Sequence, residues 1–460
     1  MKDSEVRGGL NGLSKQELID IIIRQMAIIE QLQEKNAELV KRIEELERTT
    51  HRQAAPFRIA ENKRVLHPGK PGRKAGHKGS YRTIEESQIE ETIKVELPCC
   101  PYCKGEVNDI QNIEQVIEEI PVIKRAVSRL ITQYGWCSCC QKEVYSSHPL
   151  QTSQATGAAK VQLGPQAKSL AMSLQYEYGM TKRKVCGLMK KVFDINFSAG
   201  GLVYASHRSA AKMEYQYQGL CTGLRRSKVV HSDETSWYVG SPKYWLWVFA
   251  NSSATAYHVS ASRGRKVIED MLGKDYAGTL VSDCLSIYDD VNDRQQKCYS
   301  HHLKAICQAI EKVDDISKAY LEQLKLLLKT AMVVKAIKAE KPPDEYIRLC
   351  SELEKQADAL IIPLRENELE EKVANRLRKQ RDHLFTFLYY DEVDATNNLA
   401  ERQLRPAVIA RKVSCGNKTQ KGAHTWEVMA SIAATANQQQ QPFQLIVADA
   451  VRLNANHVER

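Results

Sequence analysis

The stretch that decides the fold runs from residue 228 to residue 291. It begins with three strand-like runs rich in Val, Tyr, Trp and Phe: KVVHSDETSWYV (228–239), KYWLWVFAN (243–251) and ATAYHVSAS (254–262). A helical run, GRKVIEDMLG (264–273), and a further strand, GTLVSDCLSIYDDV (278–291), follow. This order predicts an antiparallel meander, a connecting helix and a fourth strand parallel to the first.

Two aspartates stand out in this pattern. Asp233 falls within the first strand and Asp283 towards the end of the fourth. A ribonuclease H-like α/β fold opens in this way and places these strands side by side, so we expect the two carboxylates to converge. Carboxylate oxygens suit Mg2+, and a pair of Mg2+ ions can activate an attacking hydroxyl and neutralise the leaving oxygen of a phosphodiester. Two aspartates hold such a pair poorly, so a third acid is expected.

The other acids of this stretch are interpreted more simply. Most acidic side chains are solvated, and we expect this of Glu234, Asp289, Asp290 and Asp293. By similar reasoning, Trp237 and Trp426 are expected in the hydrophobic core rather than stacked on nucleic-acid bases.

The chain after the fourth strand is expected to be mainly helical. Residues 303–385 carry amphipathic patterns with a break at Lys341-Pro342-Pro343, and we interpret them as an all-α insertion into the core. The next segment, DATNNLAERQLRPAVIARKVSCGN (394–417), predicts a helix that Asn397 or Asn398 caps and whose first turn carries Glu401. Pro406 should bend or divide this helix because it lacks a backbone donor.

A sustained heptad pattern occupies residues 14–48. Alternating steps of four and three connect Leu18, Ile22, Gln25, Ile29, Leu32, Asn36, Leu39, Ile43 and Leu46. This pattern predicts a parallel two-stranded coiled coil, in which one buried Asn sets the register, and therefore a homodimer. The alternative is an amphipathic helix packed on its own chain.

The periodicity ends at His51, and a basic segment follows. Residues 51–82 contain nine Lys or Arg and one acid, Glu61, with Gly and Pro concentrated in HPGKPGRKAGHKG (67–79). We interpret this segment as a flexible linker that contacts DNA phosphates. The alternative is a solubilising linker. The candidate DNA-binding residues here are Lys70, Arg73, Lys74 and Lys78.

Two cysteine pairs come next, Cys100 with Cys103 and Cys137 with Cys140. Each pair can bring two thiolates to one ion, and two pairs complete a closed tetrahedral Zn2+ site of the structural type. Strand-like residues (116–136) lie between the pairs, as in a zinc ribbon. The alternatives are reduced cysteines without a metal, or a disulfide.

Residues 160–225 are interpreted as three helices, at 166–179, 181–194 and 199–216. The short turn between the last two, with Ser198 as a candidate N-cap, resembles a helix–turn–helix. Helix pairs of this kind also occur in proteins that never touch DNA, so both interpretations stay open.

The bulk properties bound the class of protein. At 460 residues the chain is too long for one ordinary domain, and a formal charge of +10 permits a polyanionic partner without proving one. We find no apolar stretch long enough to cross a bilayer and no apolar signal peptide after Met1. The thirteen cysteines are therefore interpreted as reduced thiols, some of them binding metal, in a cytoplasmic, nucleoid-associated protein.

Several of these motifs together resemble one family. The run TNNLAER (396–402), continued by Leu404-Arg405-Pro406 and Arg411-Lys412, is similar to the signature of the insertion-sequence-66 family of transposases. The zipper-like start, the PGRKAGHKG linker, the cysteine pairs, SDET (232–235) and CYSHHLK (298–304) follow in the same order as in that family. The resemblance covers nearly the whole chain.

This resemblance implies a DDE transposase. Asp233, Asp283 and Glu401 would form its catalytic, metal-binding triad, with two Mg2+ (or Mn2+) ions in each active site. The loop after Asp283 departs from the family pattern, since Cys284-Leu285 stand where Gly-Tyr is usual. Tyr299 likewise stands where Trp is common.

Other residues near the triad have open roles. Arg402 and Arg405 are candidates for DNA phosphate contacts, or else solvated arginines. Cys298 and His301 could form half a metal site, or be a packed Cys and a His that hydrogen-bonds near the active site or donates to a phosphate. Glu401 could merely pair with Arg405 one helical turn on.

Together the sequence predicts a multidomain α/β protein. The expected parts are a coiled coil for dimerisation (1–50), a basic flexible linker (51–88), a zinc-binding module (89–150), a helical, helix–turn–helix-like region (151–226), a ribonuclease H-like core (227–302 and 386–440) with a helical insertion (303–385), and a C-terminal tail (441–460).

The expected function is binding of the ends of a mobile element, DNA cleavage and strand transfer into target DNA. The resemblance also implies small accessory proteins encoded by the same element as partners; no membrane partner is expected. The alternatives are a transposase-derived DNA-binding protein without catalysis and a metal-dependent nuclease that does not join strands.

Overall fold

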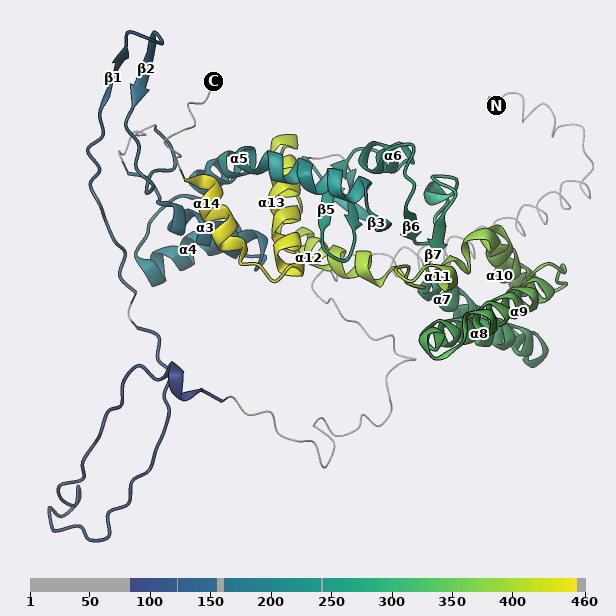
Figure 1. Cartoon of the computed structure of the whole chain (residues 1–460), viewed down its shortest axis with the longest axis horizontal. Coiled ribbons are helices and arrows are strands. Elements are labelled where there is room, and N and C mark those ends of the chain that lie inside the picture. Colours follow the sequence, from purple (N-terminus) through teal and green to yellow (C-terminus); the bar gives the residue numbers. More distant parts are fainter. Residues whose placement is uncertain (1–82, 122, 155–160, 241–242, 453–460) are drawn as a thin grey trace, which may run out of the picture. The chain divides into compact units, whose positions relative to one another are not determined.

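The computed structural model describes residues 83–121, 123–154, 161–240 and 243–452 (Figure 1). The chain divides into two compact units, Met1–Ile120 and Pro121–Arg460, and each is described by itself. The predicted coiled coil and the linker residues Lys70, Arg73, Lys74 and Lys78 lie outside the described residues and stay predictions. Within the described ranges, no helix has both the length and the apolar character that crossing a bilayer requires.

The cysteine-rich region is mostly irregular. In the first unit, the described residues contain one short 3₁₀ helix, η2 (Glu86–Gln88), and further on the turn of Cys100 and Cys103. In the second unit, β1 (Tyr134–Cys137) and β2 (Lys142–Tyr145) form an antiparallel hairpin. The strand pattern expected over 116–133 is wrong for the residues described there, which are assigned no strand. They have no neighbouring strand to pair with, and an unpaired strand is not stable in water.

A five-stranded mixed sheet forms the centre of the second unit. Its strands are β3 (Val229–Tyr238), β4 (Lys243–Ala250), β5 (Thr255–Ser260), β6 (Thr279–Ser282) and β7 (Gln295–Lys297), in the spatial order β5-β4-β3-β6-β7. The first three are antiparallel neighbours, and β6 runs parallel to β3 after the helix α6 (Lys266–Leu272). The predicted meander, connecting helix and parallel fourth strand are therefore confirmed.

The far side of the sheet differs from the prediction. β6 ends at Ser282, and the 3₁₀ helix η3 (Ser286–Tyr288) follows where the sequence pattern continued the strand. β7 was not predicted, because Gln-Gln-Lys has no apolar residue to mark a buried strand. It forms by parallel backbone pairing with β6, and all three of its side chains are buried.

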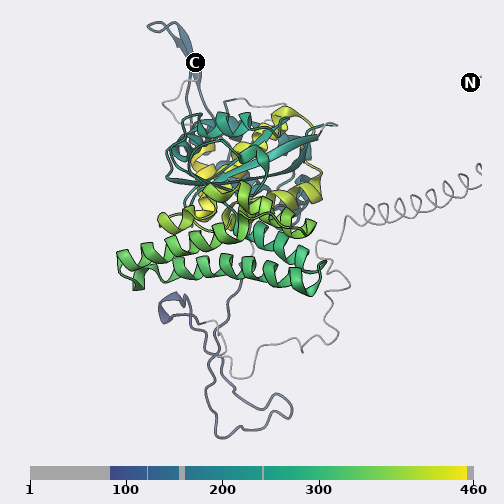
Figure 2. The same ribbon diagram turned by 90° about the vertical axis from the view of Figure 1, so that its right-hand side faces the viewer.

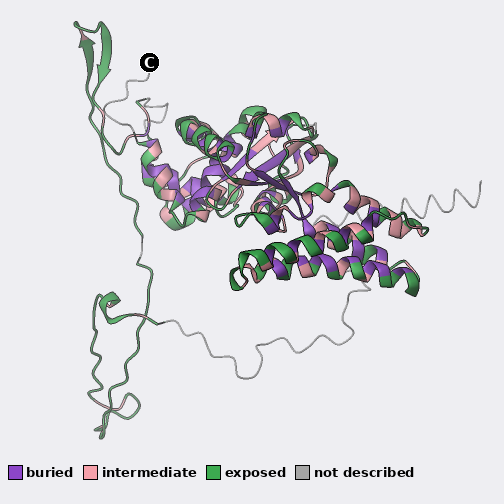
Figure 3. Cartoon of the chain, turned by 45° about the vertical axis from the view of Figure 1, so that its right-hand side comes forward, coloured by how far each residue is buried: buried purple, intermediate pink, exposed green. Residues whose placement is uncertain are grey.

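Helices cover both faces of the sheet (Figure 3). Alternate residues of β4 pack into different clusters, Trp247 and Phe249 in one, Leu246 and Val248 in the other. The first cluster includes α5 (Ala199–Arg225) and α6. The second includes the buried face of α12 (Asn398–Ser414), and α13 (Gln420–Gln438) contributes to both. This packing fixes α12 against the strand that carries Asp233.

The three predicted helices before the sheet are confirmed as α3 (Pro165–Tyr176), α4 (Lys182–Phe193) and α5. Ser198 caps α5, since its hydroxyl accepts from the backbone N–H of Gly201 at 3.0 Å. α5 is longer than predicted and reaches Arg225. Residues of the expected C-terminal tail form α14 (Phe443–Val451), which packs against α3.

The chain between β7 and α12 is helical, as predicted. Its elements are α7 (Tyr299–Ile310), α8 (Asp315–Ala336), η4 (Lys338–Glu340), α9 (Pro343–Ile361), α10 (Glu368–Lys379), η5 (Arg381–His383) and α11 (Thr386–Tyr389). α8 and α9 lie side by side (Figure 2) and share a third hydrophobic cluster, which also includes Val281 of β6. The predicted break before α9 is present, whereas α12 continues through Pro406 and is not divided there.

Candidate active site

The sheet register brings the two aspartates together. β3 pairs with β6 at Val229 with Thr279 and at His231 with Val281, so partners are 50 residues apart. Continuing this register by two residues places Asp283 beside Asp233. Neighbouring strands lie about 4.8 Å apart, and side chains at matched positions of parallel strands point to the same face. Asp283 directly follows β6, and its Oδ1 accepts from the backbone N–H of Leu285 at 2.9 Å, which orients the carboxylate.

Glu401 reaches the same region through the buried residue Asn397. The Asn397 Nδ2 donates to the backbone oxygen of Ser232 at 2.8 Å, and its Oδ1 lies 3.2 Å from Nδ1 of His231. These contacts hold the start of α12 on β3 next to Asp233. Glu401 lies one turn into α12, and its N–H donates to the backbone oxygen of Asn397 at 3.2 Å.

This arrangement corrects the predicted capping role of Asn397. Asn397 does occupy the N-cap position of α12, but its side chain makes no capping hydrogen bond. The side chain instead bonds to β3, which lies within reach only after folding. The far part of α12 is held in a similar way, because Arg411 donates to the hydroxyl oxygens of Thr235 and Ser236 at 3.0 and 2.6 Å.

The electrostatics of the site favour a bound cation. Burial raises the pKa of Asp233 to about 7, and the negative charges of Glu234, Asp283 and Glu401 act in the same direction. Negative charges that raise the pKa of Asp233 are close enough to repel its carboxylate. A divalent cation among Asp233, Asp283 and Glu401 would remove that repulsion, and their hard oxygen atoms fit Mg2+ or Mn2+.

The comparison with family models decides where the chain belongs. The model described as "Transposase IS66 family" matches residues 160–425. The chain belongs to this family. The matched range contains all five strands of the sheet, the helical insertion and α12, and thus Asp233, Asp283 and Glu401. Among the curated proteins, none matches. Membership implies that the protein is a transposase, an enzyme that acts on DNA, and that it uses a divalent metal.

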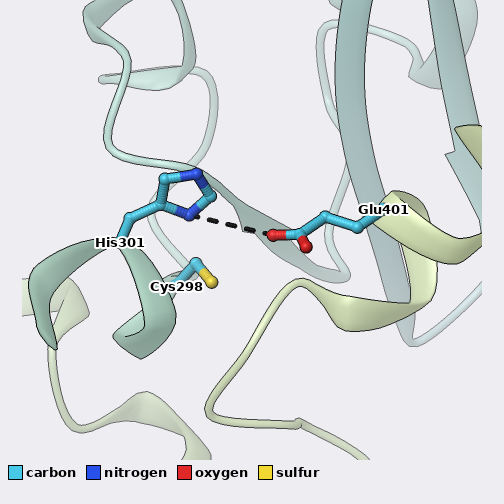
Figure 4. Close-up of side chains that lie close together, drawn as sticks. All are labelled: Cys298, His301 and Glu401. Carbon is cyan, nitrogen blue, oxygen red and sulfur yellow. Dashed lines mark ion pairs between the residues drawn. The ribbon is translucent and has the colours of Figure 1, made fainter. Parts of the chain in front are cut away.

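In this transposase, Glu401 also belongs to a second group of side chains. The ligand atoms of Cys298, His301 and Glu401 all lie within 4.8 Å of one another, and the side chains point toward a common space (Figure 4). Across the described ranges, no other set of three or more such side chains is as close, and the three acids do not form one. Sequence reasoning left Cys298 and His301 as half a metal site or as packing residues. Glu401 supplies the third side chain that the sequence alone did not connect to them.

The expectation that Glu234 and Asp289 are solvated is wrong. The Glu234 side chain is 2 % exposed; it accepts from Arg263 Nη2 at 2.8 Å and from the Tyr288 hydroxyl at 2.6 Å. Asp289 forms an ion pair with the fully buried Lys297 at 3.0 Å. Arg263 comes from the loop after β5, and Lys297 lies in β7, the strand that follows Asp289. Asp290 and Asp293 are exposed as expected.

The remaining predicted site residues have simpler surroundings. Arg402 and Arg405 are exposed, and the described part of the chain offers neither of them a hydrogen bond or ion pair. Glu401 makes no ion pair with Arg405 there; its ion-pair partner is His301. Trp237 is buried and stacks at a tilt on Trp426, with ring centroids 4.8 Å apart, so both are core residues as predicted.

The cysteine pairs lie in different compact units. Cys100 and Cys103 belong to the first unit, and Cys137 and Cys140 to the second. Within each turn, the backbone N–H of the second cysteine lowers the pKa of the first, for Cys100 and for Cys137 alike. A lowered pKa favours the thiolate that Zn2+ binds. The shared zinc site stays a prediction.

Proposed function

We propose that this protein is a DDE transposase that cleaves DNA at the ends of its own mobile element and joins the freed 3′ ends to target DNA. The main support for the proposal is the parallel register of β3 and β6, which puts Asp233 beside Asp283 when it is continued by two residues. α12, anchored on the same strand, supplies Glu401 as the third acid.

The sheet supports a ribonuclease H-like core. A three-stranded antiparallel meander followed by two parallel strands beyond its first strand is the arrangement expected for that fold. The insertion of α7–α11 enters after β7 and leaves before α12. The core therefore remains one layer of sheet with the candidate acids on β3, after β6 and on α12.

The metal chemistry follows from these side chains. Asp233, Asp283 and Glu401 would hold two Mg2+ or Mn2+ ions, which would activate a water or a 3′-hydroxyl and neutralise the leaving oxygen. The protein's part is orientation. The N–H of Leu285 orients Asp283, the N–H of Glu234 orients Asp233, and Asn397 fixes the helix that bears Glu401.

DNA binding would rest on groups outside the triad. Arg402 and Arg405 extend from the catalytic helix without protein partners in the described ranges, so they are free to contact phosphates. The basic linker, a zinc module of Cys100, Cys103, Cys137 and Cys140, and the helices α3–α5 would recognise the element's ends. The coiled coil would pair two such chains, and small accessory proteins of the same element would join them.

Single substitutions of the three acids test the proposal. Asp233→Asn, Asp283→Asn and Glu401→Gln should each abolish cleavage of an element end and joining of a precleaved end, while end binding in a gel-shift assay stays within about twofold. Asp290→Asn, at an exposed acid near the site, is the matched control and should keep full activity.

The two assays also separate the alternatives. Cleavage without joining would indicate a nuclease, and binding without either reaction in the unmodified protein would indicate a DNA-binding protein without catalysis. Full joining activity in Glu401→Gln would overturn the proposed triad.

A further inference from the structure

We propose that Cys298, His301 and Glu401 form a site for a thiophilic divalent ion of the Zn2+ class, and that such an ion competes with the catalytic ions for Glu401. Only the competition rests on the proposed function. The binding site itself depends on the three side chains and their surroundings.

The backbone holds the three ligands together. Cys298 directly precedes α7, His301 lies in its first turn, and Glu401 lies in the first turn of α12. The two helix starts are joined by two hydrogen bonds: the N–H of Asn397 donates to the Cys298 Sγ at 3.1 Å, and the N–H of Tyr299 donates to the backbone oxygen of Ala395 at 2.9 Å. The group is therefore part of the folded framework rather than a chance meeting of surface side chains.

His301 carries the observation that points to a ligand. Its Nδ1 is shielded from solvent, and among the described residues it has no hydrogen-bond partner. Its ion-pair partner is Glu401, whose Oε1 lies 4.0 Å from Nδ1 of His301. This distance is too long for a hydrogen bond. A buried polar nitrogen without a partner is unfavourable. An ion shared with Glu401 and Cys298 would satisfy it.

The donor set selects the class of ion. Zn2+ binds thiolate, imidazole and carboxylate ligands, and a site with three protein ligands leaves its fourth position to water or substrate. Thiolate and imidazole donors disfavour Mg2+, which prefers oxygen. The neighbouring Asp233 and Asp283 offer oxygen only. The two sites would thus differ in metal preference while sharing Glu401.

The distances require a small adjustment. Bond lengths of about 2.0 to 2.3 Å would put tetrahedral ligand atoms roughly 3.3 to 3.6 Å apart, against separations of up to 4.8 Å here. Cys298 is fully buried and fixed, whereas the side chains of His301 and Glu401 are 36 % and 35 % exposed and can move. Closing on the ion would draw the Glu401 carboxylate toward Cys298 and His301 and occupy an oxygen that the catalytic ions would otherwise use.

A neighbouring Cys–His pair offers a matched control. Cys284 Sγ lies 3.3 Å from Nε2 of His302, the residue next to His301, but this pair has no third ligand in the described ranges. Cys284→Ser and His302→Gln therefore remove a cysteine and a histidine beside the site without touching the proposed ligands. They stand as controls for Cys298→Ser and His301→Gln.

The test is the Zn2+ content of the full-length protein, equilibrated with Zn2+ and desalted. Cys298→Ser and His301→Gln should each hold one ion fewer per chain than the unmodified protein, and the two control variants should hold the same number. All variants keep the cysteines of the predicted zinc module, so any Zn2+ bound there is the same in every variant. With Co2+ in place of Zn2+, thiolate-to-cobalt absorption should fall in Cys298→Ser alone among the two cysteine variants. Since Cys298 is buried, the partly exposed His301 provides the second variant if Cys298→Ser fails to fold.

Equal metal content in all variants would overturn the site. The competition is tested separately: added Zn2+ should inhibit Mg2+-dependent cleavage, and His301→Gln should weaken that inhibition. Undiminished Zn2+ inhibition in His301→Gln would overturn the competition. The two proposals can fail separately. If Asp233→Asn loses cleavage but Cys298 binds no zinc, the proposed function stands and the zinc site is wrong. If Cys298 binds zinc but Glu401→Gln stays active, the zinc site stands and the catalytic triad is wrong.

Discussion

Asn397 decides the position of the third acid. Its amide bonds to Ser232 next to Asp233, its backbone N–H bonds to Cys298, and its backbone oxygen accepts from Glu401. One residue thus connects β3, the start of α7 and the start of α12. A sequence pattern identifies such an Asn only as a helix cap, because the partners of its side chain and of its N–H are more than 90 residues away.

Asn397→Ala should lower both stability and catalysis. The change leaves the buried Ser232 oxygen and His231 without their partners, and we expect a loss of about 1 to 3 kcal/mol in the free energy of unfolding, measured with urea. Cleavage should fall further than end binding, because Glu401 loses its anchor. Asn398→Ala, at the adjacent exposed position, is the control and should match the unmodified protein. An Asn397→Ala variant with unchanged stability would contradict the anchoring role.

Glu234 should matter for stability rather than for the chemistry. Glu234→Gln removes the charge that pairs with Arg263, while Tyr288 can still donate to the amide oxygen. We expect a loss of about 1 to 3 kcal/mol in urea unfolding, with cleavage retained. Removing this negative charge should also lower the pKa of Asp233, so the acid limb of a pH–rate profile should move to lower pH. Complete loss of cleavage in a folded Glu234→Gln protein would make it a catalytic residue.

The sequence predicts the surroundings of Asp233 better than those of its neighbour Glu234. The order of the strands and their alternating pattern are enough to predict that Asp233 lies beside Asp283. The burial of Glu234 was missed, because its cation Arg263 comes from a loop beyond two strands. Short-range patterns predict which face and which strand a residue occupies, whereas a pair of side chains that meets only in the folded state leaves no local signal.

At the scale of elements, α13 protects the open edge of the sheet. The backbone N–H groups of β5 donate to side chains of α13, at Ser431 (2.8 Å) and Thr435 (3.0 Å) and also at Glu427. An uncovered edge strand invites pairing with another chain. The sequence predicted neither this role nor β7, since in both cases polar side chains are buried by a partner element rather than by an apolar pattern.

His424 links α13 to α5 and should make the stability of the protein depend on pH. It bridges Glu427 at 2.8 Å and Glu214 of α5 at 2.9 Å, and the hydrogen bond to Glu427 raises the pKa of His424 to about 9. Since this value exceeds the ordinary 6.5, the contribution is complete below about pH 6.5 and is lost as the pH rises through about 9.

The measurement is the melting temperature across that pH window. His424→Gln should melt below the unmodified protein at pH 6, and the difference should shrink steadily towards pH 10. Lys421→Gln, a charge change on the same helix without an ion pair in the described ranges, should show no such trend. A difference between the His424→Gln and unmodified proteins that is the same at pH 6 and pH 10 would rule out the titration.

At the scale of the whole molecule, the sheet and helices of the second unit are described by the structure, whereas the coiled coil, the basic linker and the zinc site are predictions from the sequence. The sheet apart from β7, its helices and the insertion could be predicted because hydrophobic periodicity marks those elements. The arrangement of the cysteine module could not, since a metal site of two distant pairs depends on an ion rather than on a core. The coiled coil is the opposite case, because its heptads alone predict it, and the prediction includes a second chain as its partner.

Dimerisation through the predicted coiled coil can be tested by substitution. If Ile29 and Leu32 lie in the seam between two chains, Ile29→Lys with Leu32→Lys should place charges in a buried interface and separate the dimer. Light scattering should then report the mass of one chain instead of two. Gln31→Lys with Glu34→Lys is the matched control, because those residues fall on the outer face of the same two helical turns. Transposition joins two element ends in one complex, so the monomeric variant should still cleave single ends yet lose paired-end joining. A seam variant that stays dimeric would show that another surface holds the chains together, and equal joining by both variants would remove the zipper from the mechanism.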